Sequence, residues 1–256
     1  MWQLKVYCLY NEGFDQFLKE VVQLILSKYG SQLNIESLKE IELVNKNTYL
    51  YETDGKVINN SKIIVTSRLY ELLPILDIKA LEDNINFIIL KQTLFHEMGH
   101  INDMVLMPKL YEYAFSEDSN REQIASQFWL EYIAEKRTTI FEGFQSFDLC
   151  DEFVKEDWRC TMCSLDENIN STNFAYLTKV LPYFMVATKD INVREKYINQ
   201  IKNKLLVQYI NELDIELKNL EERYLFDDVT MLIGLYNIID KYYHKFMLNF
   251  RKKNNV

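Results

Sequence analysis

Residues 84–104, with the sequence NINFIILKQTLFHEMGHINDM, decide the expected fold. Written as a helix, this stretch is apolar on most of its circumference, and Asp83 or Asn84 can cap its first turn. The sequence therefore predicts a long, largely buried helix from about Asn84 to Met104.

Two of the three histidines in the chain lie on this helix, in the run His96-Glu97-Met98-Gly99-His100. Residues four apart project from one face of a helix, so both imidazoles can bind one metal ion. Glu97 lies about 100° round the helix from His96 and can reach a metal-bound water without being a ligand. The alternative is an ordinary amphipathic helix. The apolar residues around the motif favour the metal site over this alternative, because buried imidazoles and a buried carboxylate need partners.

A catalytic zinc site needs a third protein ligand and an open position for water. One known pattern adds a third histidine six residues after His100, with a glycine between them. The chain has Asp103 and Leu106 at those two positions. The sequence therefore excludes a three-histidine site and leaves a carboxylate as the third ligand.

A second predicted helix, residues 120–141, supplies two such carboxylates. Glu131 and Glu135 lie one turn apart among apolar residues, so both would face the first helix. They could instead form a salt-bridged helical face with Lys136 and Arg137. The sequence alone leaves these two interpretations open.

These residues resemble the gluzincin-type zinc metallopeptidases, and most closely the small intracellular ImmA/IrrE-like peptidases of phage and mobile elements. The resemblance rests on the HExxH helix and on the E-x-x-A pattern from Glu131 to Ala134. It implies that His96, His100 and Glu131 bind Zn²⁺ and that Glu97 is the general base. It covers roughly the first 140 residues, including the predicted helix and small sheet that precede the motif.

Other side chains are candidates for supporting roles at this site. The thermolysin-like branch has Asn before the ligand glutamate and Asp four residues after it, where this chain has Leu130 and Glu135. Glu135 can still hydrogen-bond a ligand histidine. Asp103 could contact His100, or it could be an exposed carboxylate at the helix end. The candidates for stabilising an oxyanion are Tyr111, Tyr113, Tyr132 and His244.

The remaining sequence predicts an α+β fold with a small mixed or antiparallel sheet. A helix is expected at residues 14–28, with Gly30 as a left-handed cap, and a loop at residues 108–118. Asp54-Gly55 is a hairpin signal. Strands are predicted at residues 41–44, 48–51 and 62–66, and further helices at residues 67–76, 149–153, 174–187, 193–220 and 229–250. We expect a zincin-like domain at residues 1–143 and a mainly helical region, substrate-binding or regulatory, at residues 144–256.

Composition narrows the choice of function. The 29 basic and 38 acidic residues give a net charge of −9, which disfavours a nucleic-acid partner. The first residues do not resemble a secretory signal, and no apolar run approaches a membrane span, so we expect a cytoplasmic protein with no membrane partner. The four cysteines are too sparse for a disulfide scaffold and are expected to be free thiols, including the pair Cys160 and Cys163.

The sequence therefore predicts a zinc-dependent peptidase that hydrolyses an intracellular protein or peptide. Zinc would lower the pKa of a bound water to about 7, and Glu97 would remove its proton. The alternative is a non-enzymatic regulatory or interaction protein, with a relic or structural metal site and a partner bound through the C-terminal helices.

Overall fold

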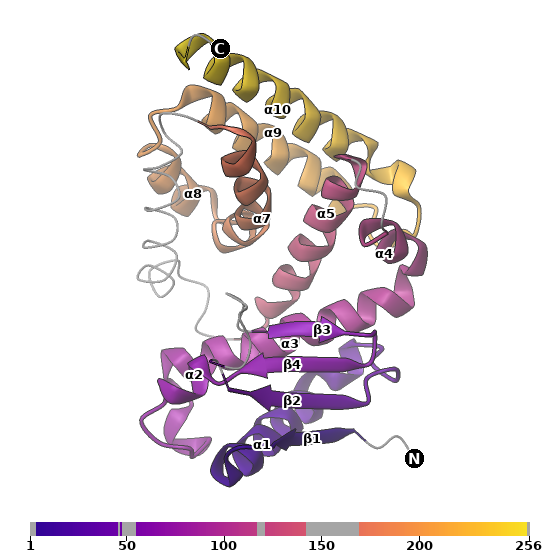
Figure 1. Ribbon diagram of the computed structural model, residues 1–256, viewed down its shortest axis with the longest axis vertical. Coiled ribbons are helices and arrows are strands. Elements are labelled where there is room, and N and C mark those ends of the chain that lie inside the picture. Colours follow the sequence, from indigo (N-terminus) through magenta and orange to yellow (C-terminus); the bar gives the residue numbers. More distant parts are fainter. Residues whose placement is uncertain (1–3, 46, 48–54, 117–120, 142–168, 255–256) are drawn as a thin grey trace. The chain divides into compact units, whose positions relative to one another are not determined.

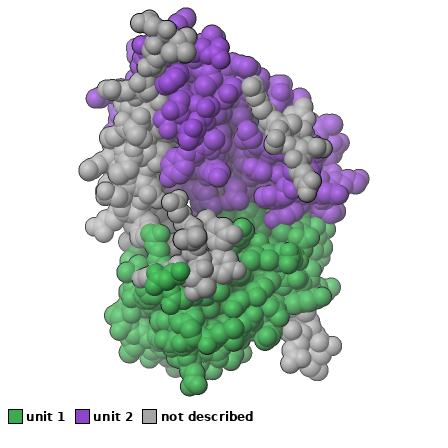
Figure 2. Space-filling view, in the orientation of Figure 1, with its two compact units in different colours: residues 1–106, 136–144 green, residues 107–135, 145–256 purple. Residues whose placement is uncertain are grey.

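The computed structural model describes residues 4–45, 47, 55–116, 121–141 and 169–254. The chain divides into two compact units, coloured separately in Figure 2: Met1–Leu106 with Lys136–Phe144, and Met107–Glu135 with Gln145–Val256. The predicted α+β class is confirmed, because the described part of the first unit contains a mixed sheet and that of the second is mainly helical. The predicted functional boundary after residue 143 stays a prediction.

The sheet of the first unit has four described strands, in the order β1-β2-β4-β3 (Figure 1). Three run parallel, since β1 pairs with β2 and β2 pairs with β4, and β3 pairs antiparallel with β4. The strands span Lys5–Cys8 (β1), Glu40–Val44 (β2), Gly55–Ile58 (β3) and Lys62–Thr66 (β4). The predictions for β2 and β4 are confirmed. The sequence analysis missed β1, which is short and only partly buried.

A tight turn joins β3 to β4. Asn59 and Asn60 have φ angles of 51° and 56°, a left-handed conformation that asparagine tolerates better than most residues. The sequence analysis instead marked Asp54-Gly55 as a hairpin signal. Gly55 is the first residue of β3, and Asp54 lies outside the described residues, as does the predicted strand at residues 48–51.

Two helices cover one face of the sheet. Helix α1, Glu12–Tyr29, packs on β1 and β2, and helix α3, Ile85–Leu106, packs on β3 and β4. The strand residues that point into this core are fully or almost fully buried: Ile41, Leu43, Ile63 and Val65. On the other face, Glu40, Glu42 and Lys62 carry charge, and Lys62 pairs with Glu42 at 2.7 Å. The alternation is that of a sheet covered on one face, although Ile64 on β4 departs from it, at 5% exposed.

Local signals explain where these helices begin and end. The Asn84 side chain accepts hydrogen bonds from the backbone N–H groups of Asn86 and Phe87, so the predicted cap of α3 is confirmed. The left-handed cap predicted at Gly30 is wrong, because Gly30 has a φ of −59° and begins a short 3₁₀ helix, η1, Gly30–Gln32. Helix α2, Arg68–Glu71, is shorter than predicted, and a 3₁₀ turn, η2, Lys79–Leu81, precedes α3.

The second unit corrects two sequence predictions. The loop expected at residues 108–118 contains helix α4, Pro108–Ala114, which starts on a proline at its first position. The single helix expected at residues 193–220 is two helices, α8, Ile191–Ile198, and α9, Lys204–Glu221. The break follows from Asn203, whose side chain caps α9 by accepting from two backbone N–H groups. The described residues of the chain also form α5, Arg121–Thr138, α7, Ser171–Ala187, η3, Val229–Leu232, and α10, Ile233–Asn254. The helix predicted at residues 149–153 lies outside the described residues.

An aromatic cluster joins α7, α9 and α10. The rings of Phe174, Tyr209 and Tyr242 follow one another at centroid distances of 5.8 Å and 4.9 Å. Tyr242, Phe184 and Phe246 are buried, whereas Tyr183 is 40% exposed. Buried Arg194 adds a polar tie between the helices, because it donates to the backbone oxygen of Met185 and pairs with Asp214. Among the described residues, no helix combines the length and apolarity needed to cross a bilayer.

The β3–β4 turn makes a direct prediction about stability. Asn60→Ala should lower the free energy of unfolding by about 1 kcal/mol, because an alanine side chain disfavours the left-handed region. Asn60→Gly is the matched control and should be close to neutral, since glycine adopts positive φ freely. Urea denaturation measures both variants. Equal stability of the two would show that the turn does not hold this conformation.

Candidate metal centre

Helix α3 brings two imidazoles together inside the protein. His96 and His100 are 6% and 7% exposed, and their Nε2 atoms lie 3.1 Å apart. Their ring centroids are 4.8 Å apart and the ring planes cross at 80°. The spacing of four residues produces this arrangement, because it returns the second side chain to the same face one turn later.

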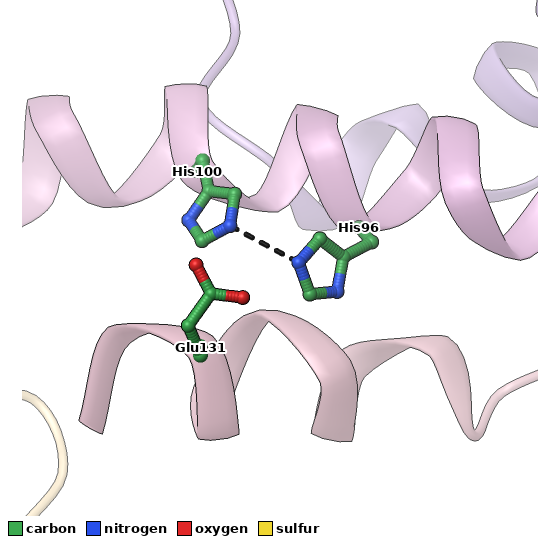
Figure 3. A group of neighbouring side chains, drawn as sticks. All are labelled: His96, His100 and Glu131. Carbon is green, nitrogen blue, oxygen red and sulfur yellow. Dashed lines mark hydrogen bonds between the residues drawn. The ribbon is translucent and has the colours of Figure 1, made fainter. Parts of the chain in front are cut away.

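A carboxylate from a second helix completes the group. One ligand atom from each of His96, His100 and Glu131 can be chosen so that all three lie within 4.8 Å of one another. Figure 3 shows the two imidazoles extending from α3 toward the carboxylate of Glu131 on α5. The structure therefore brings together the three residues that the sequence predicts as ligands.

The donor set fits a borderline divalent cation such as zinc. Two imidazole nitrogens and one carboxylate oxygen form a ligand set found in zinc sites that keep a fourth position open. When two imidazole nitrogens face each other, one proton can lie between them, but a second proton would place two positively charged rings in contact. A metal cation avoids this, because it can accept a lone pair from each nitrogen. The residues present are therefore chemically suited to hold zinc, although other first-row metals accept similar ligands.

Glu97 lies beside the first residue of the edge strand. It is 8% exposed, and a Cβ atom built on Gly55 would approach its Cγ and Oε1 atoms to 2.8 Å and 2.9 Å. The same Cβ would lie 2.9 Å from Thr93 Cγ2. Any residue other than glycine at this position would therefore force the side chains of Glu97 and Thr93 to shift. Sequence reasoning treated Gly55 as a turn residue and missed this contact.

The last turn of α5 is tied to α3 by a buried ion pair. The guanidinium of Arg137 binds both carboxylate oxygens of Asp103, one at 2.8 Å, and it also donates to the backbone oxygen of Gly99 at 3.4 Å. Asp103 is fully buried, so the alternative of an exposed carboxylate is wrong. Burial raises the pKa of Asp103 above its ordinary value, and the guanidinium of Arg137 opposes that rise.

Asp103 and Arg137 pair with each other, and neither has the partner that the sequence suggested for it. Asp103 was expected to contact His100, and its observed partners are Arg137 and the side-chain amide of Asn102 at 3.2 Å. Arg137 was considered as a partner for Glu131 or Glu135 on its own helix. A bidentate contact to another helix also fixes the rotation of α5 about its axis at this turn, which a surface salt bridge would not do.

Glu131 receives a hydrogen bond from a residue that the sequence analysis did not connect with the site. The hydroxyl of Tyr183 on α7 donates to Glu131 Oε2 at 2.7 Å. No signal in the sequence points to this pair, because 52 positions separate the two residues. Glu135 follows on the next turn of α5 and is partly buried, and its supporting role stays a prediction.

The four oxyanion candidates differ in their surroundings. Tyr132 donates to Glu221 at 2.5 Å, and burial together with this carboxylate raises the pKa of Tyr132 above its ordinary value. His244 is exposed on α10 and lies 3.5 Å from Asp240. Tyr111 packs against Phe115 within a centroid distance of 4.7 Å. These contacts account for three candidates without assigning any of them to the reaction.

The predicted free thiols can be checked at one of the four cysteines. Cys8 is a buried free thiol, and the other three cysteines lie outside the described residues.

Gln92 stands one turn before His96 and is 6% exposed. Its side-chain nitrogen is buried without a hydrogen-bond partner in the described part of the chain. Gln92 is the second polar residue near the site, after Tyr183, that sequence reasoning passed over.

Comparison with protein-family models, with curated proteins and with solved structures finds no match for this chain. The resemblance to gluzincins therefore stays a prediction from the motif. A function for this chain therefore has to be inferred from the chemistry of the side chains described above.

The ion pair between Arg137 and Asp103 predicts a large effect on stability. Arg137→Met should lower the free energy of unfolding by about 3–5 kcal/mol, because it leaves a buried carboxylate without its countercharge. Without the guanidinium, the pKa of Asp103 in the folded state would rise further, so Asp103 would favour the protonated form. The loss should therefore be largest near neutral pH and should shrink as the pH falls toward about 4.

Lys19→Met is the control for this experiment, because Lys19 forms a partly exposed ion pair with Asp15 within one helix. Its removal should cost at most about 1 kcal/mol. Denaturant unfolding of both variants at two pH values gives the comparison. An Arg137→Met variant as stable as Lys19→Met would contradict the structural role assigned to this pair.

Proposed function

We propose that this protein is a zinc-dependent peptidase that acts on a peptide or protein. The observation that carries the proposal is the convergence of ligand atoms from His96, His100 and Glu131 within 4.8 Å, with Glu97 next to His96 on the same helix. This set combines three ligands with a carboxylate that is not one of them. A purely structural zinc site has no use for the additional carboxylate.

The chain's own residues would divide the chemistry between them. Zinc, when bound, supplies a Lewis acid that lowers the pKa of water to about 7 and polarises the scissile carbonyl. Glu97 would take a proton from the attacking water on its carboxylate and deliver that proton to the leaving amine nitrogen. The burial of Glu97 keeps bulk water from competing for this proton.

The edge of the sheet supports a peptide as the substrate class. In the described part of the chain, β3 has a partner strand on one side, and its first residue, Gly55, lies beside the side chain of Glu97, with no room for a Cβ atom between them. An extended peptide can add to such an edge through main-chain hydrogen bonds. Its backbone would then pass close to the general base.

One observation favours a second candidate, a non-enzymatic protein with a structural metal site. Both histidines and Glu97 are less than one-tenth exposed, as expected of ligands in a closed site. This candidate predicts four protein ligands and no exchangeable water on the metal. The resemblance to ImmA/IrrE-like peptidases belongs to the first candidate. A cytoplasmic location and a partner for the C-terminal helices are compatible with both candidates, and all three remain proposals.

The variant Glu97→Gln tests the proposed reaction. It should bind zinc like the wild type, because residue 97 is not a ligand, and it should lose at least about 100-fold in hydrolysis, because the amide cannot accept the proton. The assay is incubation with a denatured protein mixture, with mass spectrometry to detect new chain ends.

Glu112→Gln makes the same chemical change at an exposed position on α4 and should cleave like the wild type. Cleavage by Glu97→Gln at the wild-type rate would refute the assigned mechanism. A zinc-loaded wild type that cleaves nothing in the mixture would favour the structural candidate.

A further inference from the structure

We infer that Tyr183 is a positioning residue for Glu131, whose phenol group holds the carboxylate so that one oxygen faces the two histidines. This inference rests on the proposed metal site and extends it to a residue of the C-terminal helices. It gives α7 a defined part in metal binding.

The contact itself is short and joins two helices. The Tyr183 hydroxyl on α7 donates to Glu131 Oε2 at 2.7 Å. A hydrogen bond of this length from a neutral donor to a carboxylate is a strong one. The neighbouring α7 residues Leu181 and Phe184 are 0% and 1% exposed, so the helix that carries Tyr183 is anchored in the core.

The residue after Glu131 is held in a similar way by another helix. Tyr132 donates to Glu221 on α9 at 2.5 Å, and Lys189 lies 3.9 Å from the other carboxylate oxygen of Glu221. Consecutive residues of a helix point about 100° apart, so these two bonds restrain α5 from two directions. The backbone of Glu131 is thus restrained through Tyr132, and its carboxylate through Tyr183.

The chemistry of a carboxylate ligand explains why the second restraint matters. A ligand carboxylate binds a metal through an oxygen lone pair, so its orientation decides how well it reaches the metal. The hydroxyl of Tyr183 holds Oε2, and it therefore fixes the direction in which the carboxylate of Glu131 faces a metal. Residues that orient metal ligands in this way typically contribute a factor of 10–100 to metal affinity.

Tyr183→Phe tests the inference, because it removes the hydroxyl and keeps the ring. Its zinc dissociation constant, measured by competition with a chromogenic chelator at fixed pH, should rise about 10-fold. Tyr176→Phe is the matched control: Tyr176 lies on the same helix and is 46% exposed, and its variant should bind zinc like the wild type. Circular dichroism checks that both variants are folded.

A double-mutant cycle with Glu131→Gln separates positioning from a general structural effect. If Tyr183 acts through Glu131, removal of its hydroxyl should weaken zinc binding much less in the Glu131→Gln background. In the cobalt-substituted protein, Tyr183→Phe should also change the visible absorption bands, which report the ligand geometry.

Each outcome decides a different point. If Tyr183→Phe binds zinc as tightly as the wild type, this inference is overturned, whereas the proposed metal site is not affected. Additive effects in the cycle would also overturn it. A folded wild type that binds no zinc would overturn the proposed site and this inference together. Unchanged affinity with slower peptide cleavage would indicate that Tyr183 contacts the substrate instead.

Discussion

The burial of α3 is the constraint on which the rest of the site depends. This helix buries fourteen of its residues, and several of them are polar. A polar group removed from water needs a partner, so each of these side chains restricts what can lie beside it. Asp103 is satisfied by Arg137, and Asn102 accepts from the backbone N–H of Asn34 at 2.8 Å. The Nε2 atoms of His96 and His100 lie 3.1 Å apart, so a shared cation could accept a lone pair from each ring.

The second helix of the site is held at several points along its length. Its last turn carries Arg137, and Glu131 lies six residues earlier, about 9 Å along the helix axis. Between them, the bonds of Tyr132 and Tyr183 connect α5 to α9 and α7. The C-terminal helices therefore do more than extend the fold, because two of them contact α5 where the third ligand stands. Removal of these helices should disturb Glu131 before it disturbs the histidines.

Features that depend on residues close together in the sequence could be predicted, and contacts between residues far apart in the sequence could not. Periodicity and capping identified α1, α3 and α7, since these signals lie within a few residues of one another. The i, i+4 spacing of His96 and His100 was sufficient to place both on one face. Tyr183 and Arg137 were missed as partners of Glu131 and Asp103, because tertiary packing brings these pairs together over 52 and 34 positions. Helix α4 was not predicted, because proline is common both in loops and at the first position of a helix, and Pro108 holds that first position.

The central claim is that His96 and His100 are metal ligands rather than polar residues of a buried helix. Elemental analysis of the purified wild type beside a His96→Ala, His100→Ala double variant, both reconstituted with zinc and freed of excess metal, tests it most directly. The account predicts one zinc per chain in the wild type and none in the folded double variant. No zinc in the wild type, or equal zinc in both proteins, would contradict it.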